Sequence, residues 1–134
     1  MPTIPLRSRL LLAVFIGGAI GTTLRAAGAE LWPPGPGDWP WPTFAANLIG
    51  ALALGFVAEW WAEHHDQRSL LGGGLCGGLT TFSTMQLELL RMLDHDELAL
   101  AAGYAAASLT AGVLLARAGR WWADHPHSPR RRAG

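Results

Sequence analysis

Apolar residues fall in four long runs along this chain, separated by short segments rich in charge, proline or tryptophan. The runs cover residues 10–29, 43–61, 69–93 and 97–116. Because a helix of about 20 residues crosses the hydrocarbon layer of a bilayer, each run is long enough to span a membrane. The pattern predicts an all-α integral membrane protein with four transmembrane helices, in which residues 1–134 form one domain and residues 121–134 a polar tail.

The third run carries an interruption. Residues 72–78 read GGGLCGG, and each glycine inside a helix costs about 1 kcal/mol relative to alanine. Four hydroxyl side chains follow: Thr80, Thr81, Ser83 and Thr84. Non-helical backbone at membrane depth is tolerated only where it is buried in protein or lines a cavity. We therefore expect the third helix to be broken at residues 72–80 and the break to form an ion site.

Polar side chains near this break favour a small, strongly hydrated anion. Hydroxyl protons can point at an anion, and so can the electropositive edge of an aromatic ring such as Phe82. Asn47, in the second run, must find partners, and its amide either fixes helix packing or donates to an ion. In the fourth run, Tyr104 and Ser108 lie one turn apart on a polar or small stripe.

The first run carries small residues and one charge on a single helix face. Gly17, Gly21 and Arg25 follow one another at intervals of four, so the two glycines can admit a neighbouring helix closely. A charge within a membrane span faces a protein partner or water, or its side chain extends to the interface. The sequence leaves both interpretations of Arg25 open.

Charge and composition support a membrane location. Half of the residues are hydrophobic and 15% are charged, which leaves little for a soluble core. With four spans, one side of the membrane receives the arginines at positions 7, 9, 68, 117, 120 and 130–132. The positive-inside rule then predicts that both chain ends are cytoplasmic. The seven tryptophans lie at or just beyond the ends of the runs, the depth that an amphipathic ring prefers.

Several classes of function lack their residues. No phosphate-binding loop with its lysine is present, no structural zinc spacing occurs, and no nucleophile can be assembled with a base. We therefore expect neither an enzyme nor an organic cofactor nor a nucleic-acid partner. A small-multidrug-type proton-coupled exporter usually needs a carboxylate early in the first span, and here Glu30 comes after that span. A non-conducting scaffold would leave the break unexplained.

Three segments resemble the CrcB/Fluc family of fluoride channels: GGAIGTTLR at 17–25, the isolated Asn47, and above all GGLTTFST at 77–84. The resemblance covers all four runs. It implies a fluoride-specific channel in the inner (cytoplasmic) membrane of a prokaryote. Passive efflux would lower cytoplasmic fluoride that enters as neutral HF. It further implies an antiparallel, dual-topology homodimer of four-helix subunits.

The same resemblance implies roles for individual residues. Fluoride would contact Asn47, the ring edge of Phe82, and a polar track formed by Thr81, Ser83, Thr84, Glu88, Tyr104 and Ser108. A structural sodium ion at the dimer centre would be held by the backbone carbonyls of Gly77 and Thr80. Gly17, Gly21 and Arg25 would serve packing or a vestibule.

Two features depart from the family pattern. The family usually has a second phenylalanine three residues after the first, and Met85 stands there in this chain. A thioether is soft and polarizable but lacks an electropositive ring edge. The uneven arginines oppose insertion of one sequence in both orientations. This keeps open a second assembly, in which the chain pairs with a homologous subunit of opposite orientation.

Overall fold

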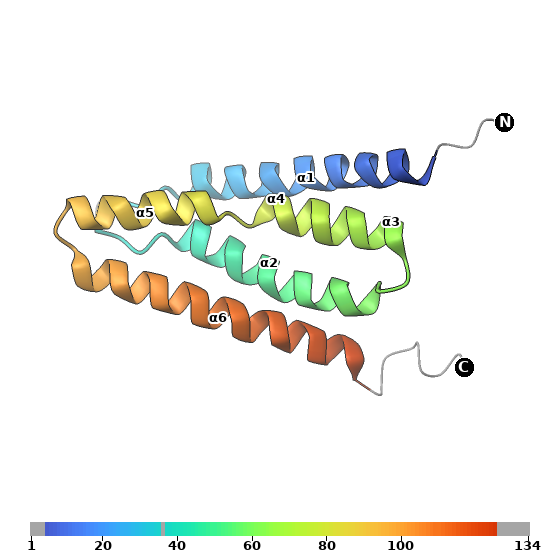
Figure 1. Ribbon diagram of the computed structural model, residues 1–134. Helices are drawn as coiled ribbons and strands as arrows, with labels where there is room; N and C mark the ends of the chain where they lie inside the picture. The colour runs from blue at the N-terminus through green and yellow to red at the C-terminus, as the bar shows by residue number, and fades with distance from the viewer. Residues whose placement is uncertain (1–4, 36, 126–134) are drawn as a thin grey trace.

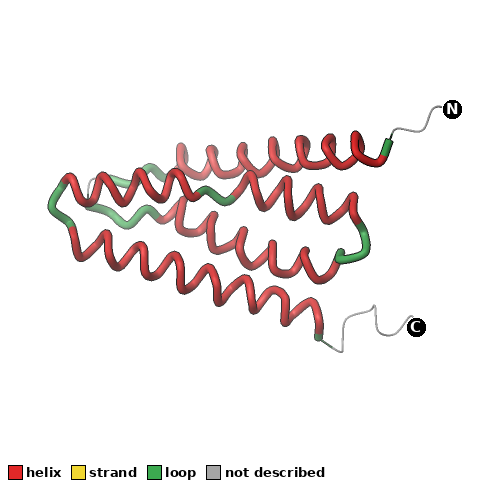
Figure 2. Tube along the Cα trace, in the orientation of Figure 1, coloured by secondary structure: helices red, strands yellow, loops and turns green. Residues whose placement is uncertain are grey.

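The chain folds into helices that run back and forth along one axis, as the computed structural model shows for residues 5–35 and 37–125 (Figure 1). No strand occurs within these described residues, which confirms the predicted all-α fold (Figure 2). Residues 126–134 of the predicted polar tail lie outside the described residues. The elements are α1 (Leu6–Leu31), α2 (Trp41–Trp60), α3 (His65–Arg68), the π-helix η1 (Ser69–Cys76), α4 (Gly77–Leu79), α5 (Phe82–Asp94) and α6 (Leu98–Asp124).

Among the described residues, three helices are long and apolar enough to cross a membrane by themselves. These are α1, α2 and α6, with 26, 20 and 27 residues, and they correspond to the first, second and fourth predicted spans. The third predicted span is divided among α3, η1, α4 and α5, of which α5 is the longest with 13 residues. The third run is therefore helical in pieces rather than as one helix.

The helix ends differ from the limits of the apolar runs. Helix α6 continues to Asp124 rather than residue 116, so residues 121–124 of the predicted tail are helical. Helix α1 likewise begins at Leu6 rather than residue 10. Arginine forms helices well, and its long side chain can reach water while its backbone stays helical. An apolar run therefore marks the part of a helix that is apolar enough for the hydrocarbon layer, not the full length of the helix.

Helices α2 and α6 pack against each other through glycines. A Cβ atom at Gly55 would lie 2.8 Å from the carbonyl carbon of Ala116, and one at Gly119 would lie 2.9 Å from the Phe56 nitrogen. Real Cβ atoms do not approach backbone this closely, so the two helices touch because these side chains are absent.

Helix α1 packs in the same manner on η1 and α4. A Cβ atom at Gly17 would lie 2.8 Å from the Leu75 nitrogen, and one at Gly21 would lie 2.7 Å from the Leu79 nitrogen. The face of α1 that carries Gly17 and Gly21 thus admits the glycine-rich segment, as in Figure 1, where α1 lies alongside it.

The glycine-rich segment itself is helical, so the break predicted at residues 72–80 is wrong for residues 72–79 and correct at Thr80. Residues Ser69–Cys76 form a π-helix and Gly77–Leu79 an α-helical turn. The backbone becomes extended only at Thr80 and Thr81, where the glycines end. The physical reason is tertiary packing: the cost of glycine in a helix is offset where its missing side chain lets two backbones approach.

Aromatic residues form a cluster at each end of α2. Near its start, the Trp39 ring meets Phe44 and Tyr104 edge to face, with ring centroids 5.3 Å apart in each pair. Near its end, Phe56 stacks on Trp60 at 5.3 Å and meets Trp122 at 6.2 Å. The tryptophans therefore lie toward the ends of the bundle, where the sequence placed them.

Candidate ion site at the helix break

The backbone leaves the helix for two residues between α4 and α5 (Figure 2). Thr80 has φ −77° and ψ 149°, and Thr81 has φ −148° and ψ 116°, so both are extended. Because one helix ends and the next begins within this short segment, the last carbonyls of α4 and the first N–H groups of α5 lack regular helical partners.

Asn47 on α2 supplies hydrogen bonds to the extended segment. Its Nδ2 donates to the Thr81 carbonyl at 3.1 Å, and the Thr81 N–H donates to its Oδ1 at 2.7 Å. A carboxamide offers the same donor and acceptor as a peptide group, so it pairs with extended backbone as a neighbouring strand would. Asn47 thus forms an interhelical bond, and the second N–H of its Nδ2 is not used by this pair.

The Thr81 hydroxyl caps α5. The Thr84 N–H donates to Thr81 Oγ1 at 3.2 Å, and this oxygen lies 2.9 Å from Thr84 Oγ1 and 3.3 Å from Ser83 Oγ. Threonine is a favoured N-cap because its oxygen accepts from an otherwise unpaired N–H. Three hydroxyls of the predicted polar track therefore form one hydrogen-bonded group at the N-terminus of α5, which is the positive end of its dipole.

Two backbone carbonyls lose their helical donors at the break. In a continuous α-helix the Thr81 N–H would bond the Gly77 carbonyl, and the Thr84 N–H would bond the Thr80 carbonyl. Both N–H groups instead bond side-chain oxygens, those of Asn47 and of Thr81. The carbonyls of Gly77 and Thr80, which the family resemblance assigns to sodium, are thereby released from the helical pattern.

A third carbonyl at this helix end, that of Gly78, is bonded from α1. Arg25 donates to it through Nε at 3.4 Å, and Thr22 Oγ1 lies 3.5 Å from the same oxygen. Arg25 is half-buried, so its guanidinium faces a protein partner. A positive charge at the C-terminus of a helix complements the helix dipole and stabilises the end at the break.

A cavity of about 230 Å³ opens beside the break. It collects side chains from α2, α5 and α6, elements that are far apart in the sequence. Six of the residues named from the sequence line it: Asn47, Thr80, Thr81, Phe82, Met85 and Ser108. Ser108 Oγ is shielded from solvent and has no hydrogen-bond partner within the part of the chain that the structure describes. A buried hydroxyl without a partner is costly, so this oxygen is available to an ion or water.

The two residues at the family's aromatic positions face different surroundings. Phe82 is 64% exposed, whereas Met85 is 5% exposed. Met85 packs in the core with Met92 and Tyr104. The ring of Phe82 therefore lies on an open face of the subunit, while the thioether of Met85 lies inside it.

Glu88 lies further along α5 and is buried between two donors. Thr43 Oγ1 donates to one carboxylate oxygen at 2.5 Å, and the Tyr104 hydroxyl donates to the other at 2.7 Å. Both bonds stabilise a carboxylate that burial alone would disfavour. Thr43 precedes Asn47 by one turn on α2, and Tyr104 precedes Ser108 by one turn on α6. The Glu88 group and the cavity at the break therefore involve the same faces of two helices.

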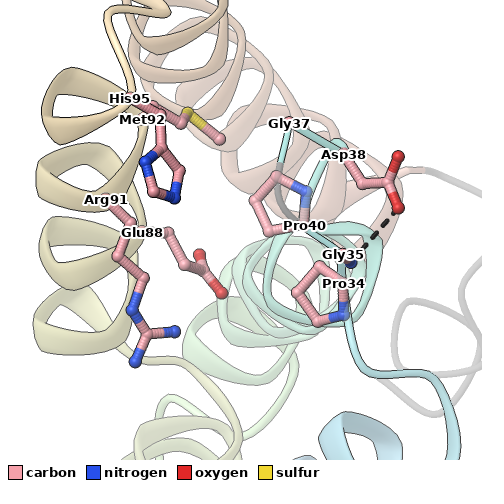
Figure 3. A pocket seen from close by; sticks show the side chains of 9 residues that line it. All are labelled: Pro34, Gly35, Gly37, Asp38, Pro40, Glu88, Arg91, Met92 and His95. Carbon is pink, nitrogen blue, oxygen red and sulfur yellow. Dashed lines mark hydrogen bonds between the residues drawn. The ribbon is translucent and has the colours of Figure 1, made fainter.

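A second cavity, of about 200 Å³, is lined in part by Glu88 (Figure 3). Glu88 and Arg91 reach it from α5, and His95 reaches it from the position just after that helix. Its opposite wall is formed by Pro34, Gly35, Gly37, Asp38 and Pro40. The Arg91 and His95 residues are exposed, so this cavity opens to the surroundings of the molecule. Glu88 thus lines this cavity and also accepts hydrogen bonds from Thr43 and Tyr104.

Two residues of this arrangement were not predicted from the sequence. Thr43 donates to Glu88, and Thr22 reaches the Gly78 carbonyl. The spacing of Thr43 four residues before Asn47 could have revealed it, because residues at that interval share a helix face. Thr22 precedes Arg25 by three residues, which gives the same signal on α1.

Comparison with known proteins identifies the family. Residues 12–120 match the family described as CrcB-like protein, Camphor Resistance (CrcB). A protein of Mycolicibacterium paratuberculosis named fluoride-specific ion channel FluC 1 is 50% identical over 110 residues, which cover 79% of this chain and 83% of that protein. A protein of Nocardia farcinica named fluoride-specific ion channel FluC 2 is 40% identical over 126 residues, covering 89% and 90%.

A third relative has a lower sequence identity. The Staphylococcus aureus protein named fluoride-specific ion channel FluC 1 is 37% identical over 110 residues, which cover 79% of this chain and 89% of that protein. The family match spans α1 to α6 and includes the break, the cavity beside it and the Glu88 group. The chain therefore belongs to the CrcB/FluC family, as its third-run motif indicated.

Proposed function

We propose that this protein is a fluoride-selective channel that lowers cytoplasmic fluoride by passive efflux across the inner membrane. The observation that carries the proposal is the cavity at the helix break, which combines the Asn47 amide, the Ser108 hydroxyl and the Phe82 ring. The names of the relatives support the choice of ion. A cavity lined by donors and a ring edge suits a small anion that must exchange its water shell for protein groups.

The pathway continues from this cavity along the Glu88 group. Fluoride would receive hydrogen bonds from the free N–H of Asn47, from Ser108 and from the hydroxyls around Thr81. The N-terminus of α5 adds a positive dipole end at the same place. Tyr104 and Glu88 then lead toward the cavity of Figure 3, which we propose as one mouth of the pathway.

Four crossings of the membrane follow if the pieces from α3 to α5 act together as the third span. These pieces cover residues 65–94, which is ample for a layer that about 20 helical residues cross. The extended residues Thr80 and Thr81 would then lie within the membrane, where the side chain of Asn47 satisfies the backbone that lipid cannot.

We propose that two copies assemble in antiparallel orientation. Phe82 lines the cavity and is nevertheless 64% exposed, and Gly77 beside the break is also exposed. A second subunit over this face would enclose the ion path that one subunit leaves open. The alternative is a pair formed with a homologous subunit of opposite orientation, which the uneven arginines favour.

A reporter fused to the C-terminus separates these two assemblies. An antiparallel homodimer requires both orientations of this one chain, so the reporter signal should come from both sides of the membrane. A signal from the cytoplasmic side alone would contradict the homodimer and favour the paired homologous subunit.

A sodium ion at the centre of the dimer is part of the proposal, and the residues at the break fit it. The carbonyls of Gly77 and Thr80 are released from the helical pattern, and sodium is a hard cation that prefers oxygen ligands. The neighbouring Gly78 carbonyl is already bonded by Arg25. The ion would join the broken helices of two subunits. The hydrogen-bond donors of each subunit would bind fluoride.

Growth on fluoride tests the cellular role. A bacterial strain that lacks its own fluoride exporters should grow at higher fluoride concentrations when it expresses this protein. The Asn47→Asp variant, expressed to the same level in the membrane, should give no such protection. Equal growth with the variant and the unchanged protein, or no protection by the unchanged protein, would contradict the proposed role.

A further inference from the structure

A groove of about 420 Å³ runs between α1, α2 and η1, well away from the cavity at the break. Val14 of α1 and Leu54 and Val57 of α2 form its apolar walls. Its polar end is formed by His65, Arg68 and residues next to them. We call this feature the α1–η1 groove. Its polar end therefore adjoins α3, which Figure 1 shows at the end of the bundle where α1 begins and α6 finishes.

The groove exists because two glycines form its floor. A Cβ atom at Gly72 would lie 3.4 Å from Val57 and 3.6 Å from Leu54, and one at Gly73 would lie 3.7 Å from Val14. These are ordinary van der Waals separations, so a methyl group would fit and a longer side chain would fill the space. The apolar part of the groove therefore offers room for a hydrocarbon chain.

A positive charge without a partner stands at the polar end of the groove. Arg68 is exposed, and its side chain makes no hydrogen bond or ion pair with any residue in 5–35 or 37–125. Nearby charges are paired: Arg9 with Asp66, and Arg120 with Glu59. The guanidinium of Arg68 is thus left as net positive charge beside an apolar groove. Such a group binds phosphate oxygens through two parallel N–H bonds.

These two features together specify an amphiphile with an anionic head. We propose that the α1–η1 groove binds an anionic phospholipid, with one acyl chain between Val14 and Leu54 and the phosphate at Arg68. Other arginines, at positions 7, 9, 117 and 120, lie near the start of α1 and near the end of α6, at the same end of the bundle. Clusters of arginine of this kind attract the anionic headgroups of lipids.

Native mass spectrometry of the purified protein tests this proposal. The protein is mixed with phosphatidylglycerol or phosphatidylcholine of identical acyl chains, and the fraction that retains lipid is measured. We expect phosphatidylglycerol to be retained about fivefold better, which is the effect of one arginine near an anionic surface. The Arg68→Gln variant should lose this preference.

Two matched control variants distinguish binding in the groove from two general effects: the loss of any surface arginine and the addition of any large side chain. Arg117→Gln removes an exposed arginine of α6 that lies outside the groove, and it should keep the preference. Gly73→Leu should fill the groove and reduce retention of both lipids. Gly112→Leu adds the same bulk where no atom lies within 4 Å of the new Cβ, and it should retain lipid normally.

Three outcomes would overturn the proposal. One is equal retention of the two lipids by the unchanged protein. Another is an equal loss in the Arg68→Gln and Arg117→Gln variants. The third is the absence of bound lipid altogether, as expected if a second subunit covers the groove. The experiment measures lipid binding rather than ion flux, so its result is independent of whether the proposed channel function is correct.

Discussion

The side chain of Asn47 and the backbone of Thr81 form two hydrogen bonds, which join α2 to the break between α4 and α5. The side-chain amide takes the place of a backbone partner, so the extended residue is satisfied without water. The same pairing frees the Gly77 carbonyl from its helical donor. One asparagine thus maintains the break and contributes to the cavity beside it.

Replacing Asn47 by aspartate should abolish conduction. The new carboxylate would keep an acceptor for the Thr81 N–H, but it would lose the donor to the Thr81 carbonyl and add negative charge to an anion path. Fluoride efflux from liposomes should fall by at least about tenfold, since like charges about 4 Å apart repel by about 4 kcal/mol at an effective dielectric constant of about 20. Asn47→Ala, which removes both bonds, should lower unfolding stability by about 1–3 kcal/mol. An Asn47→Asp protein with unchanged efflux would refute this role.

The Glu88 group should couple three helices energetically. Tyr104→Phe and Thr43→Val each remove one donor from the buried carboxylate, and each should lower stability by about 1–3 kcal/mol. In a Glu88→Gln background the Tyr104→Phe effect should shrink, because an uncharged amide depends less on that donor. Thermal unfolding followed by tryptophan fluorescence measures both effects. Thr110→Val, on the exposed face of α6, is the control and should change little. Equal Tyr104→Phe effects in both backgrounds would exclude the coupling.

The close contact of α1 with η1 predicts opposite effects at two adjacent glycines. Gly17→Ala would place a Cβ atom 2.8 Å from the backbone nitrogen of Leu75, which cannot move aside. The unfolding midpoint should fall, with a cost of about 1–3 kcal/mol for overpacking. At Gly18 a new Cβ meets nothing within 4 Å, so Gly18→Ala should leave stability equal or slightly higher. Similar midpoints for the two variants would show that α1 is not packed as described.

Replacing Met85 tests whether a phenylalanine at this position, which is usual in the family, would increase fluoride conduction. It lines the cavity beside Phe82 and lies in the core. Met85→Phe would restore an electropositive ring edge at this position, so fluoride efflux should rise while the protein remains folded. Met85→Leu has nearly the same volume and no ring, and it serves as the control with efflux near that of the unchanged protein. A folded Met85→Phe protein whose efflux does not rise would argue that the ring edge is dispensable here.

Sodium should stabilise the protein if the released carbonyls hold it. A ligand that binds only the folded state raises the unfolding midpoint as its concentration increases. The midpoint should therefore be higher in sodium than in N-methyl-D-glucamine at equal ionic strength. Identical midpoints at all sodium concentrations would speak against an ion at Gly77 and Thr80.

Sequence patterns predicted the helices and several of the residues that meet beside the break better than they predicted where the break lies. The four apolar runs correspond to the observed helical segments, and six named residues meet at one cavity. The predicted break was wrong for residues 72–79 because glycine propensity is local, whereas the contact of Gly17 with η1 is tertiary. The partner of Asn47 could not be inferred for a similar reason: spacing identifies a helix face but not the backbone opposite it.

Ion efflux from liposomes tests the central claim most directly. The purified protein is reconstituted into liposomes loaded with potassium fluoride or potassium chloride, valinomycin is added to carry the compensating charge, and each anion is followed with a selective electrode. The account predicts rapid fluoride release with no chloride release above protein-free liposomes, and loss of fluoride release in the Asn47→Asp variant. Retention of fluoride, or release of both anions at similar rates, would contradict a homomeric fluoride-selective channel.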